Sequence, residues 1–300
     1  MTNALIELSD ALAAAVARAG RMVVSVHEGG SSGVSGTIWR DDLVVTADHT
    51  IVGQQEVTLG LADGKSLRAT VVGRDSGTDI AVLKTTDPLA SALAPADAAQ
   101  LRIGEFVLAV GRRPNQGLVV SHGILSALGG AWRTWRGARM DHSFRLDLLP
   151  YTGFSGGPLI DARGRVIGVN TSGPRRSVLT VPASTVNRVL DQLLAKGRVA
   201  RGYLGVALQP VELPAATRAK GMNASTRAML VVMVEPGSPA EAAGVAIGDI
   251  VVALDDKPLA QAAGLLEALD PERIGQAIRL RLLRGGKPLE LSLTVAERAE

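Results

Sequence analysis

The chain of 300 residues contains no cysteine, and this absence removes several kinds of chemistry at once. Disulfide bonds, thiolate nucleophiles and cysteine-ligated metals are all excluded. The only histidines are His27, His49, His122 and His142, and no two of them have a His-x-x-x-His spacing. Because zinc sites need clustered nitrogen or sulfur ligands, we expect no metal and no cofactor.

Aromatic residues make up only 3% of the chain, which argues against the base-stacking platforms of single-strand binding proteins. The formal net charge is +3. Arginines cluster at Arg133, Arg136, Arg139 and Arg145, and again at Arg175 and Arg176. No nucleic-acid motif accompanies them, so we interpret them as solvated loop faces and predict no nucleic-acid partner.

No uncharged apolar run of 18 residues occurs, so no membrane-spanning helix is expected. Residues 1–21 instead predict an amphipathic helix, with Leu5, Leu8, Leu12 and Val16 on one face, packed on the body of the protein. The N-terminus lacks a signal-peptide pattern. The expectation is a cytoplasmic protein as written, or a periplasmic one if a leader has been removed.

From about residue 22 the chain consists of short β-type runs separated by turns. Such runs without intervening helices favour a barrel or sandwich over a βαβ sheet. Residues 183–196 then predict a helix that Ser184 can cap and that ends at Lys196-Gly197. A short linker, 197–201, precedes a second β-rich segment that is long enough for a core of its own. The expected strands are Met22–His27, Thr37–Trp39, Leu43–Ala47, Glu56–Leu61, Ser66–Val72, Ile80–Lys84, Phe106–Gly111, Leu118–Leu128, Arg165–Asn170 and Val178–Val181.

The run Gly153-Phe154-Ser155-Gly156-Gly157 is the most informative motif in the chain. Serine among glycines suits a nucleophile on a tight turn with free backbone N–H groups. The same G-x-S-x-G pattern marks the nucleophile of α/β-hydrolases, but that fold requires a histidine after the serine. Here the last histidine, His142, precedes Ser155. The remaining order is His49, Asp79, Ser155, which is the order of chymotrypsin.

The flanking residues carry a closer resemblance. The blocks Gly36–Ile51, Asp75–Lys84, Asp147–Leu159 and Val166–Thr171 look like those of the HtrA (DegP/DegS-like) serine proteases. The resemblance implies a mainly β fold, a chymotrypsin-like double β-barrel over residues 22–196 followed by a β-rich α+β PDZ domain over 202–297. It also implies a serine endopeptidase with the catalytic triad His49, Asp79 and Ser155.

The resemblance further implies the roles of neighbouring residues. The oxyanion hole would lie at Gly153, Phe154 and Ser155. The family usually has Asn where Phe154 stands, and Tyr151 and Thr152 replace its Asn-Pro pair, so this loop departs from the family pattern. The substrate would bind at Leu149 and Pro150, where no acid awaits a basic side chain, and along Val178, Leu179 and Thr180 by β-addition.

The second domain would bind peptide C-termini. Arg201–Val206 resembles the carboxylate-binding loop of PDZ domains, in which backbone N–H groups surround the anion. The predicted ligand-binding residues are Tyr203, Leu204, Gly205, Val206, Leu266 and Leu269, the last two on a helix over Gln261–Leu269. The segment Val211–Ser225 is expected to be an insertion.

The expected partners are polypeptide substrates, C-terminal peptide ligands and two further copies of the chain, because the family resemblance suggests a homotrimer. The loop that many relatives lengthen is only Gly29–Gly33 here, which disfavours larger assemblies built through it. The leading hypothesis is an endopeptidase in protein quality control or regulation. The alternative is a catalytically impaired, peptide-binding scaffold, motivated by Phe154; an esterase is a weaker third.

Overall fold

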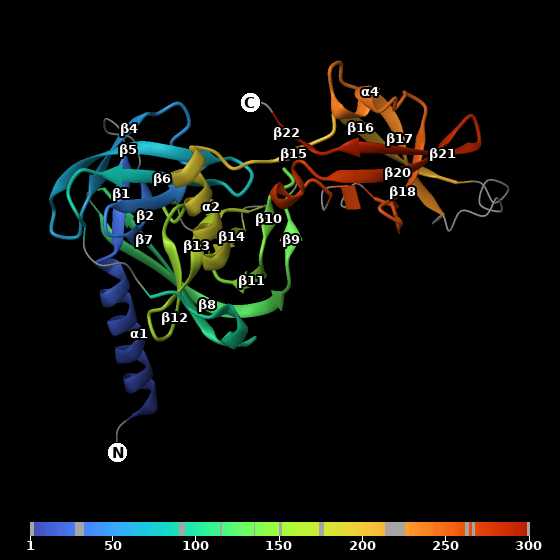
Figure 1. The fold of residues 1–300 in the computed structure, drawn as a ribbon. Helices are drawn as coiled ribbons and strands as arrows, with labels where there is room; N and C mark the ends of the chain where they lie inside the picture. The colour runs from blue at the N-terminus through green and yellow to red at the C-terminus, as the bar shows by residue number, and fades with distance from the viewer. Residues whose placement is uncertain are drawn as a thin grey trace. The chain divides into compact units, whose positions relative to one another are not determined.

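The computed structural model describes residues 3–27, 33–89, 94–114, 116–134, 136–149, 152–173, 177–213, 226–261, 264–265 and 268–298. It divides into two compact units, Met1–Val199 and Ala200–Glu300. Figure 1 shows the first unit as a helix followed by two β-rich halves, and the second as a smaller sheet. The expected mainly β fold is confirmed.

Six strands of the first half close into a barrel in the order β1-β2-β3-β6-β5-β4, all antiparallel. Alternating apolar side chains fill it, and β3 is buried at all five positions because it also faces the second sheet's core. The strands are β1 (Val23–His27), β2 (Val34–Arg40), β3 (Leu43–Ala47), β4 (Glu56–Gly60), β5 (Ser66–Asp75) and β6 (Ile80–Thr85).

The second half is a six-stranded antiparallel sheet in the order β11-β8-β7-β12-β13-β14, whose end strands β11 and β14 lie in contact. The strands are β7 (Phe106–Arg113), β8 (Gly117–Gly129), β11 (Ser143–Asp147), β12 (Pro158–Asp161), β13 (Val166–Ser172) and β14 (Val178–Pro182). A separate short hairpin, β9 (Trp132–Arg133) and β10 (Arg139–Met140), precedes β11. The two six-stranded halves form the chymotrypsin-like double barrel.

Helix α1 (Ala4–Gly20) forms where the apolar periodicity predicts it, and the side chain of Asn3 caps its start. Only its C-terminal half packs on the body, through Ala15, Ala19 and partly buried Leu12 and Val16. Leu5 is 74% exposed. The expectation that the whole stripe packs on the protein is therefore wrong for the first two turns.

Helix α2 (Ala183–Lys196) ends as expected, at Gly197 in the left-handed conformation. It also begins at Ala183 as predicted, but its N-cap residue is Pro182 rather than Ser184, and no side chain caps the helix. Ser184 lies inside the first turn. Proline fixes its own backbone angle, so a helix can begin directly after the strand that ends in Pro182 without a side-chain cap.

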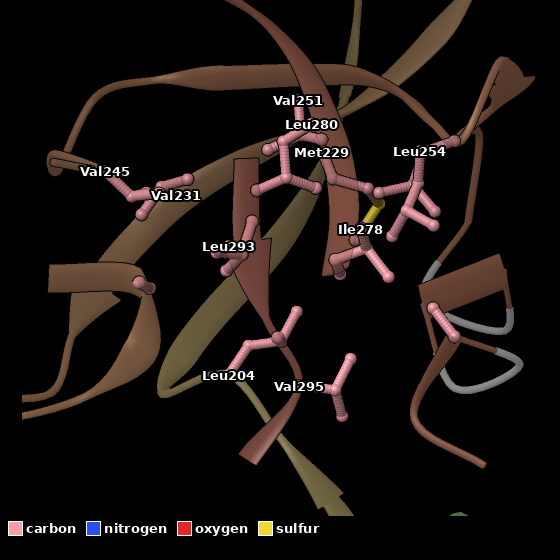
Figure 2. Close-up of a cluster of buried hydrophobic side chains, with 13 residues drawn as sticks. Leu204, Met229, Val231, Val245, Val251, Leu254, Ile278, Leu280, Leu293 and Val295 are labelled. Atoms are coloured by element: carbon pink, nitrogen blue, oxygen red, sulfur yellow. The ribbon is translucent and has the colours of Figure 1, made fainter. Parts of the chain in front are cut away.

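The second unit is built on a six-stranded antiparallel sheet, in which β16-β17-β18-β20-β21 follow one another and β19 pairs with β18. Its core contains Leu204, Met229, Ile278 and Leu293, which come from four separate segments (Figure 2). Its elements are β15 (Gly202–Tyr203), β16 (Val206–Glu212), β17 (Arg227–Val234), α4 (Pro239–Ala242), β18 (Ile250–Leu254), β19 (Lys257–Pro258), β20 (Ala277–Arg284), β21 (Lys287–Thr294) and β22 (Ala296–Glu297).

The expected insertion is shorter than predicted. Val211 and Glu212 belong to β16, where they pair with Ala228 and Arg227 of β17. Leu213 is buried beside Ala228 in a small apolar cluster. The rest of the segment, 214–225, lies outside the described residues, as does most of the loop expected at 29–33.

Candidate active site

Strand register brings His49 and Asp79 together. Ala47, the last residue of β3, pairs with Ile80, the first residue of β6. His49 follows β3 in a single 3-10 turn, Asp48–Thr50, and Asp79 immediately precedes β6. Two residues far apart in the chain therefore meet at one end of the first barrel.

Asp79 holds both the ring and the backbone of His49. Its Oδ2 lies 2.7 Å from His49 Nδ1, and its Oδ1 accepts the backbone N–H of His49 at 2.8 Å. The hydroxyl of Thr171 in β13 donates a third hydrogen bond, to Oδ2. This arrangement fixes the ring orientation and leaves Nε2 facing away from the carboxylate.

These contacts shift both pKa values. The hydrogen bond that His49 donates to Asp79 raises the pKa of His49, although burial acts in the opposite direction. Burial alone would raise the pKa of Asp79, but the hydrogen bonds from His49 and Thr171 outweigh it and lower that pKa. Asp79 is therefore an anion near neutral pH, and it stabilises a proton on His49.

Asp48, the residue before His49, was not singled out from the sequence. Its carboxylate is only 8% exposed, and Oδ1 lies 3.5 Å from a guanidinium nitrogen of Arg74 without forming a hydrogen bond. Burial raises the pKa of Asp48, and its negative charge adds to the rise in the pKa of His49. The charge of Asp48 therefore helps to set the pKa of His49, its neighbour in the chain.

The turn that precedes Asp79 accepts two hydrogen bonds from a segment outside the first barrel. The Thr134 hydroxyl donates to the Gly77 carbonyl at 3.0 Å, and Arg136 donates to the Ser76 carbonyl at 2.9 Å. Both belong to the β9–β10 hairpin, which carries part of the arginine cluster noted in the sequence. This hairpin therefore contacts the turn that positions Asp79.

The turn around Ser155 depends on glycine. Gly153 has φ +97° and Gly156 φ +86°, both in the left-handed region. A Cβ on Gly156 would lie 1.9 Å from the carbonyl oxygen of Ser35. The glycines around the serine are therefore required by the backbone, as the motif suggested.

Ser35 in β2 fixes this turn to the first barrel, a role that the sequence did not reveal. Its N–H donates to the Ser155 carbonyl at 3.0 Å, and its hydroxyl donates to the Gly153 carbonyl at 2.5 Å. On the other side, the Gly156 N–H donates to the Asn170 carbonyl, one residue before Thr171. Through these bonds the Ser155 turn is tied to the strand that contacts Asp79.

Two features of the Ser155 turn bear on its chemistry. The N–H groups of Gly153 and Ser155 donate to nothing in the described part of the chain, so both are available to an oxyanion. Within the same residues, Ser155 Oγ makes no hydrogen bond to His49. Catalytic hydrogen bonds are often long or absent before substrate binds, so the lack of this bond does not exclude a nucleophile–base pair.

Phe154 is 3% exposed and lies in the core of the second sheet with Leu101, Phe144 and Leu159. The departure from the family's Asn therefore places an apolar anchor between Gly153 and Ser155. The sequence alone left open whether a bulky residue disturbs this loop. The structure accommodates the ring below the turn, and Gly111 provides the space, since a Cβ there would lie 3.0 Å from the ring.

The structure describes four of the five residues predicted to bind substrate, all except Pro150. Leu179 and Thr180 pair with Thr171 and Asn170 of β13, and β14 is the last strand of the hydrogen-bonded sheet, so its outer edge is suited to strand addition. Val178 pairs with Ser172 in the same register. Leu149 is 67% exposed, and Pro150 and Tyr151 lie outside the described residues. The apolar specificity pocket stays a prediction.

The loop predicted to bind a peptide carboxylate has the backbone for that role. Gly205 has φ +79°, and the N–H groups of Leu204 and Gly205 find no acceptor in the described part of the chain. Leu204 is 2% exposed, so its side chain belongs to the core (Figure 2) and only its backbone can face a ligand. Val206 and Leu269 are partly buried against the same core.

Tyr203 and Leu266 are the two remaining residues predicted to bind a PDZ ligand. The phenol of Tyr203 bonds to Glu235, which raises the pKa of Tyr203. Leu266 lies outside the described residues, together with residues 262, 263 and 267 of the expected helix.

Two protein-family models match the chain. Residues 34–169 match the trypsin-like peptidase domain, and residues 202–295 match the PDZ domain. The chain belongs to the HtrA family. Within this family it resembles a probable periplasmic serine endoprotease, DegP-like, of Rhizobium meliloti strain 1021, with 35% identity over 265 residues. It also resembles the periplasmic pH-dependent serine endoprotease DegQ of Escherichia coli K12, with 34% identity over 260 residues.

These matches cover 86% and 84% of this chain but 52% and 56% of the two relatives, so the chain spans about half of their length. Solved HtrA structures match it more completely. The HtrA-type protease AlgW with a tripeptide superposes with a TM-score of 0.77 at 28% identity, covering 96% of this chain and 98% of AlgW. The serine endoprotease from Yersinia pestis gives a TM-score of 0.75 at 29% identity, covering 95% and 97%. Among the described residues, no helix is long and apolar enough to cross a membrane.

Proposed function

We propose that this chain is a serine endopeptidase that cleaves unfolded or exposed polypeptides with Ser155, His49 and Asp79 as its catalytic triad. The observation that carries the proposal is that Asp79 bonds to both the ring and the backbone of His49, while β13 links Asp79 to the Ser155 turn. Two N–H groups of that turn have no acceptor among the described residues. Membership of a family whose named relatives are serine endoproteases supports it.

In the proposed reaction, Ser155 Oγ attacks the peptide carbonyl while His49 Nε2 takes its proton and passes it to the leaving amine. Asp79 keeps the proton on Nδ1 and stabilises the imidazolium, which is consistent with the raised pKa of His49. The N–H groups of Gly153 and Ser155 bind the oxyanion; loss of one such donor typically costs about 3 kcal/mol of transition-state stabilisation. Phe154 contributes through the backbone that it anchors.

The substrate strand would add to the edge of β14 along Val178–Thr180. With Leu149 and Pro150 at the specificity position and no acid there, cleavage is expected after Val, Ala, Leu or similar residues. Mapping the products of a denatured protein tests this. Predominant cleavage after Arg or Lys would contradict the assigned pocket.

Digestion of casein by the wild-type chain and by Ser155→Ala tests the activity. We expect complete loss in the variant with an unchanged circular dichroism spectrum, because the nucleophile is absent and the fold is retained. Proteolysis that persists in the pure variant would exclude Ser155. Absence of cleavage by the wild-type chain under every activating peptide would instead favour the alternative, a peptide-binding scaffold with a triad that does not work.

We further propose that residues 202–297 act as a PDZ domain that binds peptide C-termini at the Tyr203–Val206 loop and regulates the protease. A related AlgW structure contains a bound tripeptide. The contacts of Thr134 and Arg136 with the turn before Asp79 make the β9–β10 hairpin a candidate relay within the protease unit. A homotrimer and a periplasmic role in protein quality control complete the proposal, by similarity to the family.

Coupling between the two activities is measurable. Peptides with apolar C-termini should raise the rate of casein cleavage, and substrate should in turn tighten peptide binding, because linkage is reciprocal. Arg136→Ala should reduce the activation without reducing the peptide affinity. Peptide binding that leaves the cleavage rate unchanged would limit the PDZ domain to tethering substrate.

A further inference from the structure

One cavity of the protease unit has no role in the proposed reaction. It lies where the end of β1, the β4–β5 hairpin and the β7–β8 hairpin meet, and has a volume of about 440 Å³. We call it the arginine pocket; the residues of interest in it are Ser25, His27, Gly60, Ser66, Arg112 and Arg113.

The arginine pocket carries positive charge without a matching acid. Arg112 is half-buried, and its guanidinium donates to the carbonyls of Val23 and Gly20 rather than to a carboxylate. Burial lowers the pKa of Arg112, and no acidic neighbour acts against this. Arg113, beside it, forms no ion pair in the described part of the chain. Two neighbouring cations with no counter-ion create a potential that favours an anion.

Polar side chains also line the arginine pocket, among them Ser25, His27 and Ser66. His27 also lines the pocket, but its Nδ1 is covered by surrounding atoms and makes no hydrogen bond to the described residues, so we assign it no contact with a ligand. Gly60 keeps the wall open, because a Cβ there would lie 2.4 Å from the hydroxyl oxygen of Ser25. An oxyanion of a few atoms matches this space and the charge of the two neighbouring arginines.

The position of Arg113 connects the pocket to the active site. A Cβ built on Gly153 would lie 2.9 Å from Cγ of Arg113, so the arginine stem covers the glycine whose N–H we assign to the oxyanion hole. Because Gly153 is two residues before Ser155, we expect a polypeptide bound at Ser155 to lie close to Arg113. A side chain next to the cleaved bond would then be near the arginine pocket.

We propose that the arginine pocket is a substrate subsite that binds the carboxylate of an acidic side chain close to the cleaved bond, with Arg113 as its specificity-determining residue. The proposal rests on the proposed protease function and adds a second element to its substrate class: an apolar residue at the primary pocket and Asp or Glu near it. A free anion such as inorganic phosphate shares the same chemistry, so the test separates the two sources.

The first arm maps the products of a denatured proteome with the wild-type chain, Arg113→Ala, Arg113→Glu and the control Arg163→Ala, an exposed arginine in a distant turn. We expect Asp and Glu to be enriched at one fixed position, lost in Arg113→Ala and replaced by Lys and Arg in Arg113→Glu. Replacing Asp by Asn there should lower kcat/KM about five- to tenfold in the wild-type chain only. An acidic preference that survives in Arg113→Ala would overturn the proposal.

The second arm does not depend on catalysis. Binding of the matched Asp and Asn peptides is measured with Ser155→Ala chains that carry either Arg113 or Ala at this position. Tighter binding of the Asp peptide that disappears without Arg113 supports the subsite even if the wild-type chain proves inactive. Equal binding of both peptides overturns the subsite and leaves the protease proposal to its own test. Arg113-dependent stabilisation by inorganic phosphate without any Asp/Asn difference would show a free-anion site and likewise overturn the proposal.

Discussion

Asp79 contacts His49 through both carboxylate oxygens, one on the ring nitrogen at 2.7 Å and one on the backbone N–H at 2.8 Å. Asp79 itself adopts a left-handed backbone with φ +61°, which few residues other than Gly, Asn and Asp tolerate. The residue is therefore constrained twice, by its conformation and by its two hydrogen bonds. Asparagine is the substitution that keeps the first constraint and alters only the second.

Asp79→Asn should lower kcat by about 10³- to 10⁴-fold while the chain stays folded. The amide cannot stabilise the imidazolium, and it favours the wrong tautomer of His49. Thr171→Val is the matched control, because it removes a hydrogen bond to Asp79 Oδ2 without touching His49, and should cost on the order of tenfold. Initial rates on a peptide substrate measure both. An Asp79→Asn variant as active as Thr171→Val would contradict the role of Asp79.

The pH profile provides a separate prediction. His49 acts as a base only when it is neutral, so kcat/KM should rise as pH increases through its pKa. The charge of Asp48 helps to raise that pKa. Asp48→Asn removes the charge, lowers the pKa of His49 and should move the acidic limb of the profile to lower pH.

The control for this prediction is Asp63→Asn, which removes an equal charge at an exposed turn and is not among the groups that shift the pKa of His49. Its acidic limb should coincide with that of the wild-type chain. A limb that stays in place in Asp48→Asn, or moves to higher pH, would show that Asp48 does not act on His49.

The sequence predicted much of this site because the relevant signals are local. The glycines of the Ser155 turn, the apolar strand before His49 and the order of the three residues can all be read along the chain. Ser35 and Thr171 could not be found in this way, because each acts across at least 90 residues or between sheets on a partner that only the register brings near. Strand β12 was missed because it is short, begins with proline and is buried at all four positions, so it shows no alternation. Strand β11 does alternate, as Ser-Phe-Arg-Leu-Asp, and that pattern could have revealed it.

The differences at the helices have physical causes of the same kind. The stripe in α1 correctly predicts a helix, but the periodicity does not tell how many of its turns meet a partner. Ser184 fits the preference for a capping residue, yet the N-cap residue is Pro182, two positions earlier. Local propensity therefore predicted that both helices form. It did not predict how much of α1 is buried or which residue caps α2.

Phe154→Ala should destabilise the protease unit by about 3–5 kcal/mol, because it leaves a cavity beneath the Ser155 turn. Phe154→Leu retains apolar volume and should cost much less. Thermal unfolding of the full chain, followed with fluorescence and circular dichroism, measures the difference. If Phe154→Ala is as stable as the wild-type chain, the ring does not anchor the turn.

Gly205→Ala should abolish binding of peptides with apolar C-termini. Its Cβ would lie 2.1 Å from Cβ of Ser238, so the loop must move. Gly237→Ala is matched in backbone strain, with φ +72° against +79°, but its Cβ meets nothing within 4 Å. That control should bind the peptide nearly normally, and amidating the peptide C-terminus should weaken binding to the wild-type chain. Equal affinity for free and amidated peptides would remove the carboxylate from the account.

The central claim is that Ser155 is a nucleophile activated by His49. Incubation with a fluorophosphonate probe, followed by peptide mapping, tests it most directly, because the probe reacts with activated serines and does not require a known substrate. The account predicts a single label on Ser155, strongly reduced in His49→Ala and Asp79→Asn. A chain that remains unlabelled at Ser155 with activating peptide present, or one labelled equally in His49→Ala, would contradict it.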